Sequence, residues 1–521
     1  MRTVIFGVDG LTFRILHPLI ERGDLPNFQR LSQQGCEAVL ESKYPPVTPA
    51  AWTSLSTGLK PAQHGVYDFW EYEEPREAGA ARQSRVQTHR KGGKAIWNIL
   101  SEYGKQVLVI NVPLTYPTDT VNGIMVSGYM TPSTSVDFTY PTAFKEELLR
   151  TVPEYEIDVD LRSIFRGDVE EGKKRLVDAV LRMTERRMDL TMHLLKEKPW
   201  DFCYVAFVGA DRLQHAIWEE IISLDTHATE YYRLLDHSLG LILEQLGPDD
   251  SLFVISDHGF QGVSTAFDIN EFLLSVDLLK LSSDTQRSKS RRNANLKYRM
   301  KQLGLLSLAR KTKRRLEASG IVKKYQGDVY HPLLTDIDWR STLAYVPSQS
   351  GFLGGYADIF LDDSLDAQKV AQLRDALNRQ VNPQTGKPLI DAIYSTEVFG
   401  SGPFAPLEPH LLLLPTDGIT FDMKLGNTRF WGEMSRMRGA HQKDGVLYAY
   451  GGGIKRGFNA PDAEIYDLVP TVLRSMNLPL PGEFDGRILD EIFEPGGKQA
   501  HTSDAGDGSL ARRKLKKLLE A

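Results

Sequence analysis

The chain has 521 residues, of which 41% are hydrophobic and 25% are charged, and its formal net charge is −6 at pH 7. These values are typical of a large globular protein, and so small a net charge argues against binding polyanions by overall charge alone. Only two cysteines, Cys36 and Cys203, are present, which argues against a disulfide framework and against a thiolate metal site.

The N-terminal stretch TVIFGVDG has the pattern of a buried strand rather than of a cleavable leader. No run of about 18 apolar residues occurs in the sequence, so we expect no membrane-spanning segment. On these grounds we expect a cytoplasmic protein. A chain of this length is expected to form one large core with insertions, or two to three domains.

Short β-branched runs alternate with helical patterns along the first half of the chain. Strands are predicted at 2–9, 106–113, 200–209 and 251–259, and helices at 25–35, 94–104, 175–198 and 229–247. This alternation predicts the α/β class, with a mostly parallel central sheet covered by helices on both faces. Near-continuous apolar strands such as FCYVAFV fit a sheet that is buried on both sides.

The pattern breaks over residues 271–336, for which we predict a basic helical insertion or cap. From Arg287 to Lys324 there are fourteen lysines or arginines and one acidic residue. Such a run is either a solvated helical surface or a positive field that steers an anionic substrate or associates with an anionic surface. Nucleic acid is a weaker candidate because the stretch holds a single aromatic residue, Tyr298.

The α/β pattern returns after the insertion, with strands predicted at 354–361, 410–415 and 445–451. A short basic amphipathic stretch, ARRKLKKLLEA, ends the chain. The predicted organisation is therefore a catalytic core in two parts, 1–270 and 337–495. The basic insertion, 271–336, lies between them, and a basic tail, 496–521, follows.

Three predicted strands are followed by carboxylate or imidazole side chains. Asp9 follows VIFGV, Asp211 lies just after CYVAFVG, and Asp257 and His258 follow LFVIS. In open α/β sheets the ligand crevice lies outside the carboxyl ends of the strands, so these side chains are expected to converge there. Taken singly, each aspartate also fits the common role of a turn former or helix cap.

Two histidines extend this set. His215 follows Asp211 by four residues, a spacing that places both on one side of a helix, and His441 stands just before a predicted strand in RGAHQKDG. Carboxylate and imidazole ligands suit zinc or manganese, and a mixed set without cysteine favours a catalytic metal site with open positions.

Thr48 lies in PPVTPAAWTSLSTG, in front of a proline and a predicted helix start. A threonine before proline is expected to cap the helix. The same position brings its hydroxyl to the positive end of the helix dipole, where a phosphate is favoured. From its position alone Thr48 is therefore expected to cap the helix, with its hydroxyl at a place that would also suit a phosphate.

Taken together and in this order, these residues resemble the type I phosphodiesterase/nucleotide pyrophosphatase family of the alkaline phosphatase superfamily. The resemblance is carried by GVDGL, PPVTPAAWTSLSTGLKPAQHGVYDF, GADRLQH, SDHGF, RGAHQKDG and LVPTVLRSMNLPLPGEFDGRIL. It covers most of the chain, except the basic insertion. It implies an alkaline-phosphatase-like fold and a hydrolase that acts on phosphate esters, either phosphodiesters or pyrophosphate-type bonds.

The resemblance also implies two divalent metal ions, zinc with manganese as the alternative, each held by three residues. The implied ligands are Asp211, His215 and His441 for one ion, and Asp9, Asp257 and His258 for the other. Thr48 would attack phosphorus, with its hydroxyl next to the second ion. A phosphomonoesterase and a phosphoryl transferase of the same fold remain open as alternatives, and so does a catalytically inactive binding module.

The chain departs from the family at one position. In the nucleotide pyrophosphatases an asparagine that helps to hold a phosphoryl oxygen follows the HGIxD segment, whereas HGVYDFW has Phe69 there. Asn111, in VINVPLTYP, is the candidate substrate-binding residue instead, although a polar residue at a strand end explains it equally well. His64, in AQHG, is expected to fix the turn after the Thr48 helix rather than to take part in the chemistry.

Overall fold

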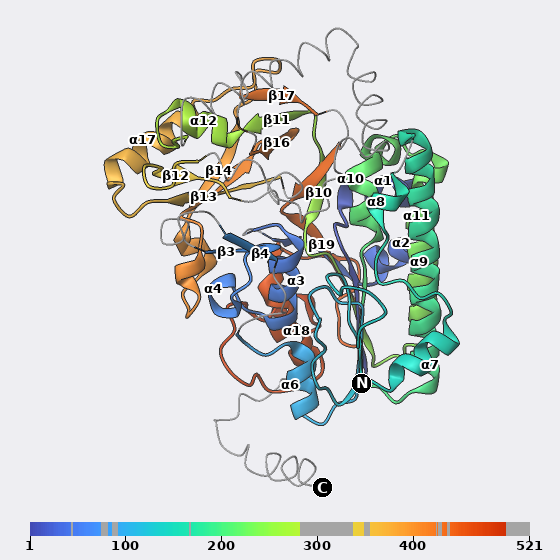
Figure 1. Cartoon of the computed structure of the whole chain (residues 1–521). Coiled ribbons are helices and arrows are strands. Elements are labelled where there is room, and N and C mark those ends of the chain that lie inside the picture. Colours follow the sequence, from blue (N-terminus) through green and yellow to red (C-terminus); the bar gives the residue numbers. More distant parts are fainter. Residues whose placement is uncertain are drawn as a thin grey trace.

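Figure 1 shows the computed structural model of the chain. It describes residues 1–42, 45–73, 82–85, 92–165, 168–281, 337–347, 355–423, 425, 430–434 and 438–495. The main body is a ten-stranded sheet in the order β20-β2-β19-β9-β1-β8-β5-β6-β7, with β21 also paired to β2. Its strands are β1 (Thr3–Val8), β2 (Cys36–Glu41), β5 (Val107–Ile110), β6 (Gly123–Val126), β7 (Thr139–Tyr140), β8 (Phe202–Phe207), β9 (Ser251–Ile255), β19 (Asp444–Gly451), β20 (Phe458–Asn459) and β21 (Ala463–Glu464).

The middle of this sheet, β9-β1-β8-β5-β6, is parallel, and β19 and β7 are antiparallel to their neighbours in it. Side chains along β1 alternate between two hydrophobic cores, with Val4 and Phe6 in one and Ile5 in the other. All three are fully buried. Since both faces of the strand need apolar residues, β1 is a continuous apolar run, as expected for a parallel sheet covered on both sides.

Helices cover both faces, on opposite sides of the sheet in Figure 1. One layer is formed by α1 (Phe13–Glu21), α2 (Pro26–Gln34), α7 (Phe144–Thr151), α8 (Leu161–Ile164), α9 (Val169–Glu197), α10 (Gly209–Ile222) and α11 (Thr226–Leu243). The other is formed by α3 (Thr48–Thr57), α6 (Ile96–Glu102) and α18 (Leu468–Ser475). The predicted α/β/α arrangement with a mostly parallel central sheet is confirmed.

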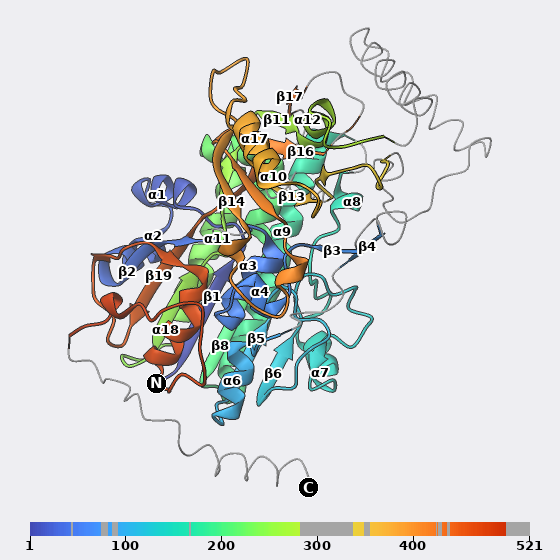
Figure 2. The same ribbon diagram turned by 90° about the vertical axis from the view of Figure 1, so that its left-hand side faces the viewer.

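A smaller body lies beyond the end of the sheet at which β1 ends, as Figures 1 and 2 show. It contains a sheet of order β12-β13-β15-β14 and a sheet of order β16-β11-β17, with their own hydrophobic core. Its elements are β11 (Thr265–Asp268), α12 (Ile269–Ser275), β12 (Ala344–Tyr345), β13 (Ala357–Leu361), α17 (Ala367–Asn378), β14 (Ile390–Ser395), β15 (Leu411–Pro415), β16 (Ile419–Asp422) and β17 (Trp431–Glu433).

Between the two bodies, β10 (Gly259–Gly262) pairs with β18 (Gly439–Gln442) in an antiparallel ribbon. The remaining elements are α4 (Pro61–His64), β3 (Trp70–Glu73), β4 (Arg82–Arg85) and the 3-10 turns Thr396–Phe399, Ala405–Leu407, Ile465–Asp467 and Asp490–Ile492. In the part of the chain that the structure describes, no helix has both the length and the apolar composition that a bilayer crossing requires.

The predicted division of the chain stays a prediction. Most of the expected basic insertion, residues 282–336, and the expected basic tail, 496–521, lie outside the described residues. The described start of the expected insertion, with α12 and Leu281, belongs to the smaller body, and Leu281 forms an isolated bridge to Ile337. Residues 265–268, 337–347 and 355–434 contribute the rest of that body where they are described, and the chain returns to the main sheet at β19.

Candidate active site

The strand-end residues lie at one edge of the main sheet. Asp9 directly follows β1, Asp257 and His258 follow β9 after one further residue, and Asp211 lies in the first turn of α10, just after β8. These three strands are parallel neighbours in the order β9-β1-β8. Their carboxyl ends therefore meet at the place where open α/β sheets bind ligands.

A first cluster consists of Asp211, His215 and His441, whose candidate ligand atoms all lie within 4.8 Å of one another. The Nε2 atoms of His215 and His441 are 3.2 Å and 3.0 Å from Oδ1 of Asp211, and 3.1 Å from each other. His215 is one turn after Asp211 on α10, and His441 comes from β18. The β10-β18 ribbon thus brings together residues that are 230 positions apart.

A second cluster consists of Asp9, Asp257 and His258, with the same spread of candidate ligand atoms. His258 Nε2 is 3.5 Å from Asp9 Oδ1 and 3.2 Å from Asp257 Oδ2, and all three side chains are fully buried. None of these three atoms has a hydrogen-bond partner. Three unsatisfied polar atoms that face one another inside a protein are costly unless something binds between them.

Backbone carbonyls orient all three imidazoles in the same way. The Nδ1 atoms of His215, His441 and His258 lie 3.0 Å, 2.9 Å and 3.1 Å from the carbonyl oxygens of Gly439, Pro46 and Gly259. Only a protonated Nδ1 can donate to a carbonyl, so the neutral ring presents the lone pair of Nε2 to its cluster. This is the arrangement in which histidine binds a metal ion.

The two clusters are adjacent. The rings of His258 and His441 stack with their centroids 3.7 Å apart and their planes inclined by 21°. Phe260, on β10, packs against both rings and against His215. Each cluster therefore has an aromatic wall, and the two sets of ligand atoms belong to one buried centre.

Burial and like charges shift the pKa values in this centre. Burial and neighbouring carboxylates raise the pKa of Asp9 well above its ordinary value, and burial together with Asp211 does the same for Asp257. Burial lowers the pKa of His258 and of His441. Burial would raise the pKa of Asp211 too, but the imidazoles of the first cluster and an adjacent guanidinium outweigh it and hold this pKa well below its ordinary value. A bound cation would offset the charge of these buried carboxylates.

Helix α3 is fastened to both clusters. Pro46, just before the helix, accepts the hydrogen bond from His441, and Trp52 Nε1 donates to Asp9 Oδ2 over 3.2 Å. Thr48 lies between these two contacts and is 2% exposed. The prediction that Thr48 caps the helix is wrong by one residue: Val47 is the N-cap, and Thr48 is the first helical residue with Pro49 after it.

Two other residues singled out in the sequence lie outside the clusters. The Asn111 amide is engaged at both ends, donating to Ser127 O over 3.2 Å and accepting a short hydrogen bond from the Tyr155 hydroxyl, so its contact with substrate stays a prediction. His64 accepts from the Val66 N–H over 3.2 Å and lies 3.0 Å from Ser54 Oγ on α3, as expected for a residue that fixes the turn.

Sequence reasoning missed Arg212, although it stands next to Asp211 in GADRLQH. Its guanidinium donates a short hydrogen bond to Asp211 Oδ2 and two hydrogen bonds, of 3.2 Å and 2.9 Å, to Asp158. It also lies 4.4 Å from the centre of the Tyr129 ring. Phe69 reaches the same ring, at 6.0 Å in an edge-on contact. The sequence did show an arginine next to a predicted metal ligand, but it could not predict that this arginine pairs with Asp158, 54 residues earlier.

Known structures share this fold. Phosphonoacetate hydrolase from Sinorhizobium meliloti 1021, solved with phosphonoformate, is 14% identical with a TM-score of 0.55, and the alignment covers 90% of this chain and 94% of that one. Murine ectonucleotide pyrophosphatase/phosphodiesterase 5, solved as an inactive form with AMP, is 12% identical with a TM-score of 0.52, covering 95% of this chain and all of that one. At such identities the likeness shows the fold, and it confirms the alkaline-phosphatase-like prediction.

The comparison of sequences is more specific. None of the curated proteins compared with this chain matches it. The family model described as type I phosphodiesterase / nucleotide pyrophosphatase matches residues 3–354, about two thirds of the chain, and this span includes seven of the eight predicted site residues. The chain therefore belongs to the type I phosphodiesterase/nucleotide pyrophosphatase family and is a hydrolase of phosphoester bonds.

Proposed function

We propose that this enzyme hydrolyses phosphodiester or pyrophosphate-type bonds with Thr48 as its nucleophile and two divalent metal ions in the two clusters. The observation that carries the proposal is the pair of adjacent three-residue clusters, with Nε2 atoms and carboxylate oxygens facing inward, beside the first turn of α3. A binding module would not need two such centres beside a hydroxyl.

The residues present fit divalent ions. The unpartnered atoms of the second cluster can serve as metal ligands. So can the Nε2 atoms of the imidazoles in both clusters, because backbone carbonyls hold their Nδ1 atoms. A donor set of carboxylate oxygens and imidazole nitrogens, three for each ion, favours zinc, with manganese as the alternative. When bound, two such ions lower the pKa of a hydroxyl and stabilise the attacking and leaving oxygens of an in-line displacement.

The chain's own groups account for the steps. Thr48 Oγ forms a bond to phosphorus as the bond from phosphorus to the first leaving oxygen breaks, and the leaving group departs as an alcohol or phosphate. Water then attacks the phosphothreonine, which restores the Thr48 hydroxyl and releases the second product. Thr48 is the first residue of α3, so the positive end of the helix dipole lies where it would favour the phosphoryl oxygens.

The test compares bis(p-nitrophenyl) phosphate with p-nitrophenyl phosphate as substrates of the purified chain. After treatment with a chelator, hydrolysis of the diester should disappear and return with added zinc or manganese. Thr48→Ala should lose hydrolysis but keep its metal content, since one hydroxyl in the helix contributes only about 1 kcal/mol to folding. Turnover that survives the chelator or the substitution would refute the proposal, and a clear preference for the monoester would favour the phosphomonoesterase alternative.

A further inference from the structure

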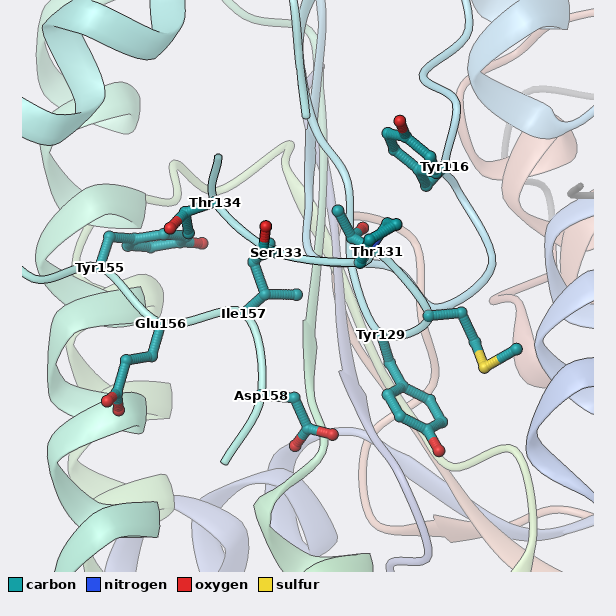
Figure 3. A pocket seen from close by; sticks show the side chains of 11 residues that line it. Tyr116, Tyr129, Thr131, Ser133, Thr134, Tyr155, Glu156, Ile157 and Asp158 are labelled. Atoms are coloured by element: carbon teal, nitrogen blue, oxygen red, sulfur yellow. The ribbon is translucent and has the colours of Figure 1, made fainter. Parts of the chain in front are cut away.

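The structure contains a cavity of 710 Å³, which Figure 3 shows from close by. It is lined by Tyr116 and by two stretches of chain, 129–134 and 155–158. Its volume falls in the range of roughly 300–1,000 Å³ that is usual for small-molecule sites. The cavity is thus large enough to receive a substituent of the size of a sugar or a polyol.

One wall of the cavity is held in place by a buried arginine. Arg187, on α9, is 1% exposed and donates to the carbonyl oxygens of Ile157 and Ala206 over 2.8 Å and 2.9 Å. Tyr155, two residues before Ile157, donates its hydroxyl to Asn111 at the end of β5. These contacts tie the stretch 155–158 to the ends of two strands of the main sheet, so this wall is preformed.

A single guanidinium separates the cavity from the first cluster. Arg212 contacts Asp211 on one side and Asp158, which lines the cavity, on the other. Its planar group lies over the ring of Tyr129, which lines the cavity too. Figure 3 shows Asp158 and Tyr129 on the same side of the cavity. A phosphodiester held at the clusters would therefore have one of its substituents next to this opening.

The charge of Arg212 is already compensated. Two carboxylates, those of Asp158 and Asp211, pair with one guanidinium, so this arginine offers little net attraction to a further anion. Of the eleven lining residues none is cationic, Glu156 and Asp158 are acidic, and six carry hydroxyl groups. Hydroxyls donate and accept hydrogen bonds with a polyol, whereas the negative charge of a second phosphoryl group would be repelled by the acidic pair.

Resting on the function proposed above, we propose that this cavity binds one alcohol substituent of a phosphodiester and selects an uncharged, hydroxyl-bearing substituent over one that carries a second phosphoryl group. Asp158 is the residue that sets this preference, because it both lines the cavity and neutralises Arg212. The enzyme is then a phosphodiesterase for polyol or glycosyl diesters rather than for diphosphates.

The experiment uses two diesters that share a p-nitrophenyl leaving group and differ only in the other substituent, which is glyceryl or glyceryl phosphate. We expect the metal-loaded wild type to prefer the glyceryl diester in kcat/KM by about tenfold or more. One unit charge about 10 Å away, at an effective dielectric constant of about 20, changes binding by roughly tenfold. Equal values, or a preference for the phosphorylated diester, would overturn the proposal.

Asp158→Asn should raise kcat/KM for the phosphorylated diester relative to the glyceryl one by roughly tenfold, since it leaves Arg212 with a single carboxylate. Glu156→Gln is the matched control, because it removes the same charge from an exposed lining residue of the same stretch, whereas Asp158 is the one that pairs with Arg212. Equal shifts in the two variants would refute the role of Asp158. Thermal denaturation of both variants checks that they fold.

A binding measurement keeps this inference separate from the proposed function. Calorimetric titration of Thr48→Ala with the two diesters should show the same preference for the glyceryl compound without any turnover. If the wild type cleaves neither diester, the proposed function fails, while the calorimetric preference still decides the selectivity of the cavity. If the wild type cleaves both equally and the variant binds both equally, the proposed function stands and the selectivity is refuted.

Discussion

Replacing Asp257 by asparagine should stabilise the metal-free protein and weaken its response to metal. The carboxylate accepts from the Gly10 N–H over 3.1 Å through Oδ1, while Oδ2 faces His258 Nε2 at 3.2 Å. Because Nδ1 of His258 donates to the Gly259 carbonyl, Nε2 is an acceptor, and two acceptors therefore face each other. An amide would keep the first hydrogen bond and donate Nδ2–H to the imidazole.

The expected gain is about 2–3 kcal/mol in the free energy of unfolding at pH 8. One new buried hydrogen bond contributes about 1 kcal/mol, and removing an uncompensated buried charge contributes the remainder. Burial raises the pKa of Asp257, so the folded wild type binds its proton more tightly than the unfolded chain does. Metal-free wild type should therefore lose stability as the pH rises above about 4, and Asp257→Asn should lose less.

Urea unfolding at pH 8, with and without chelator, measures both effects. Saturating zinc at about 100 times its dissociation constant should add about 2.7 kcal/mol for each site of the wild type, and clearly less to the variant. Asp250→Asn is the control, since Arg2 and the neighbouring backbone outweigh burial there and lower the pKa of this carboxyl, so its loss should destabilise. A metal-free Asp257→Asn protein less stable than the wild type, or one equally stabilised by zinc, would refute the reasoning.

Three further predictions concern stability and metal content. Burial raises the pKa of Glu408 to about 7, so a buried charge is present at pH 8. Glu408→Gln should therefore raise the free energy of unfolding at pH 8 by roughly 1–2 kcal/mol after allowance for solvent screening, and leave it unchanged below pH 4.5. Urea titrations at both pH values measure this difference. Gly7→Ala should lower the free energy of unfolding by about 1–3 kcal/mol, because its Cβ would lie 2.6 Å from the buried Trp52 ring. Gly432→Ala is the control and should leave it unchanged in the same assay, because no atom lies within 4 Å of the added Cβ. His441→Ala should reduce the metal content measured by mass spectrometry from two equivalents towards one, and two retained equivalents would contradict its place in the first cluster.

The main sheet and the clusters could be predicted because their signals are local. Strands such as β1 and β8 are unbroken apolar runs, and the side chains that follow them must meet at one edge once the strands are parallel. The sequence pattern marked His441 as a candidate, but its place in the first cluster needed the family resemblance, because nothing in its own neighbourhood shows that β18 returns beside β10.

The smaller body was not predicted as a separate unit. Its strand β11 lies before the basic stretch and pairs with β16 and β17, more than 150 residues later. Pairing of this kind depends on the topology of the whole chain, and the sequence of a short strand does not show which distant strand it pairs with. For the same reason the bridge from Asp158 through Arg212 to Asp211 is visible only in the folded chain.

The helix cap shows a limit of another kind. Threonine before proline is a common capping pattern, yet the extended residue that precedes the helix is Val47, which has no side-chain hydrogen bond to give. The chain anchors this helix start through Pro46 and Trp52 instead, by contacts to the two clusters. The hydroxyl of Thr48 therefore makes no capping hydrogen bond to the helix. A nucleophile needs a hydroxyl that is not engaged in this way.

The stereochemical course at phosphorus tests the central claim, attack by Thr48, most directly. The substrate is a p-nitrophenyl phosphorothioate diester of known configuration, hydrolysed in isotopically labelled water by the metal-loaded wild type. Attack by Thr48 followed by attack of water inverts the configuration twice, so the account predicts net retention. Net inversion would show that water attacks phosphorus in a single displacement, and it would contradict the assignment of Thr48 as the nucleophile.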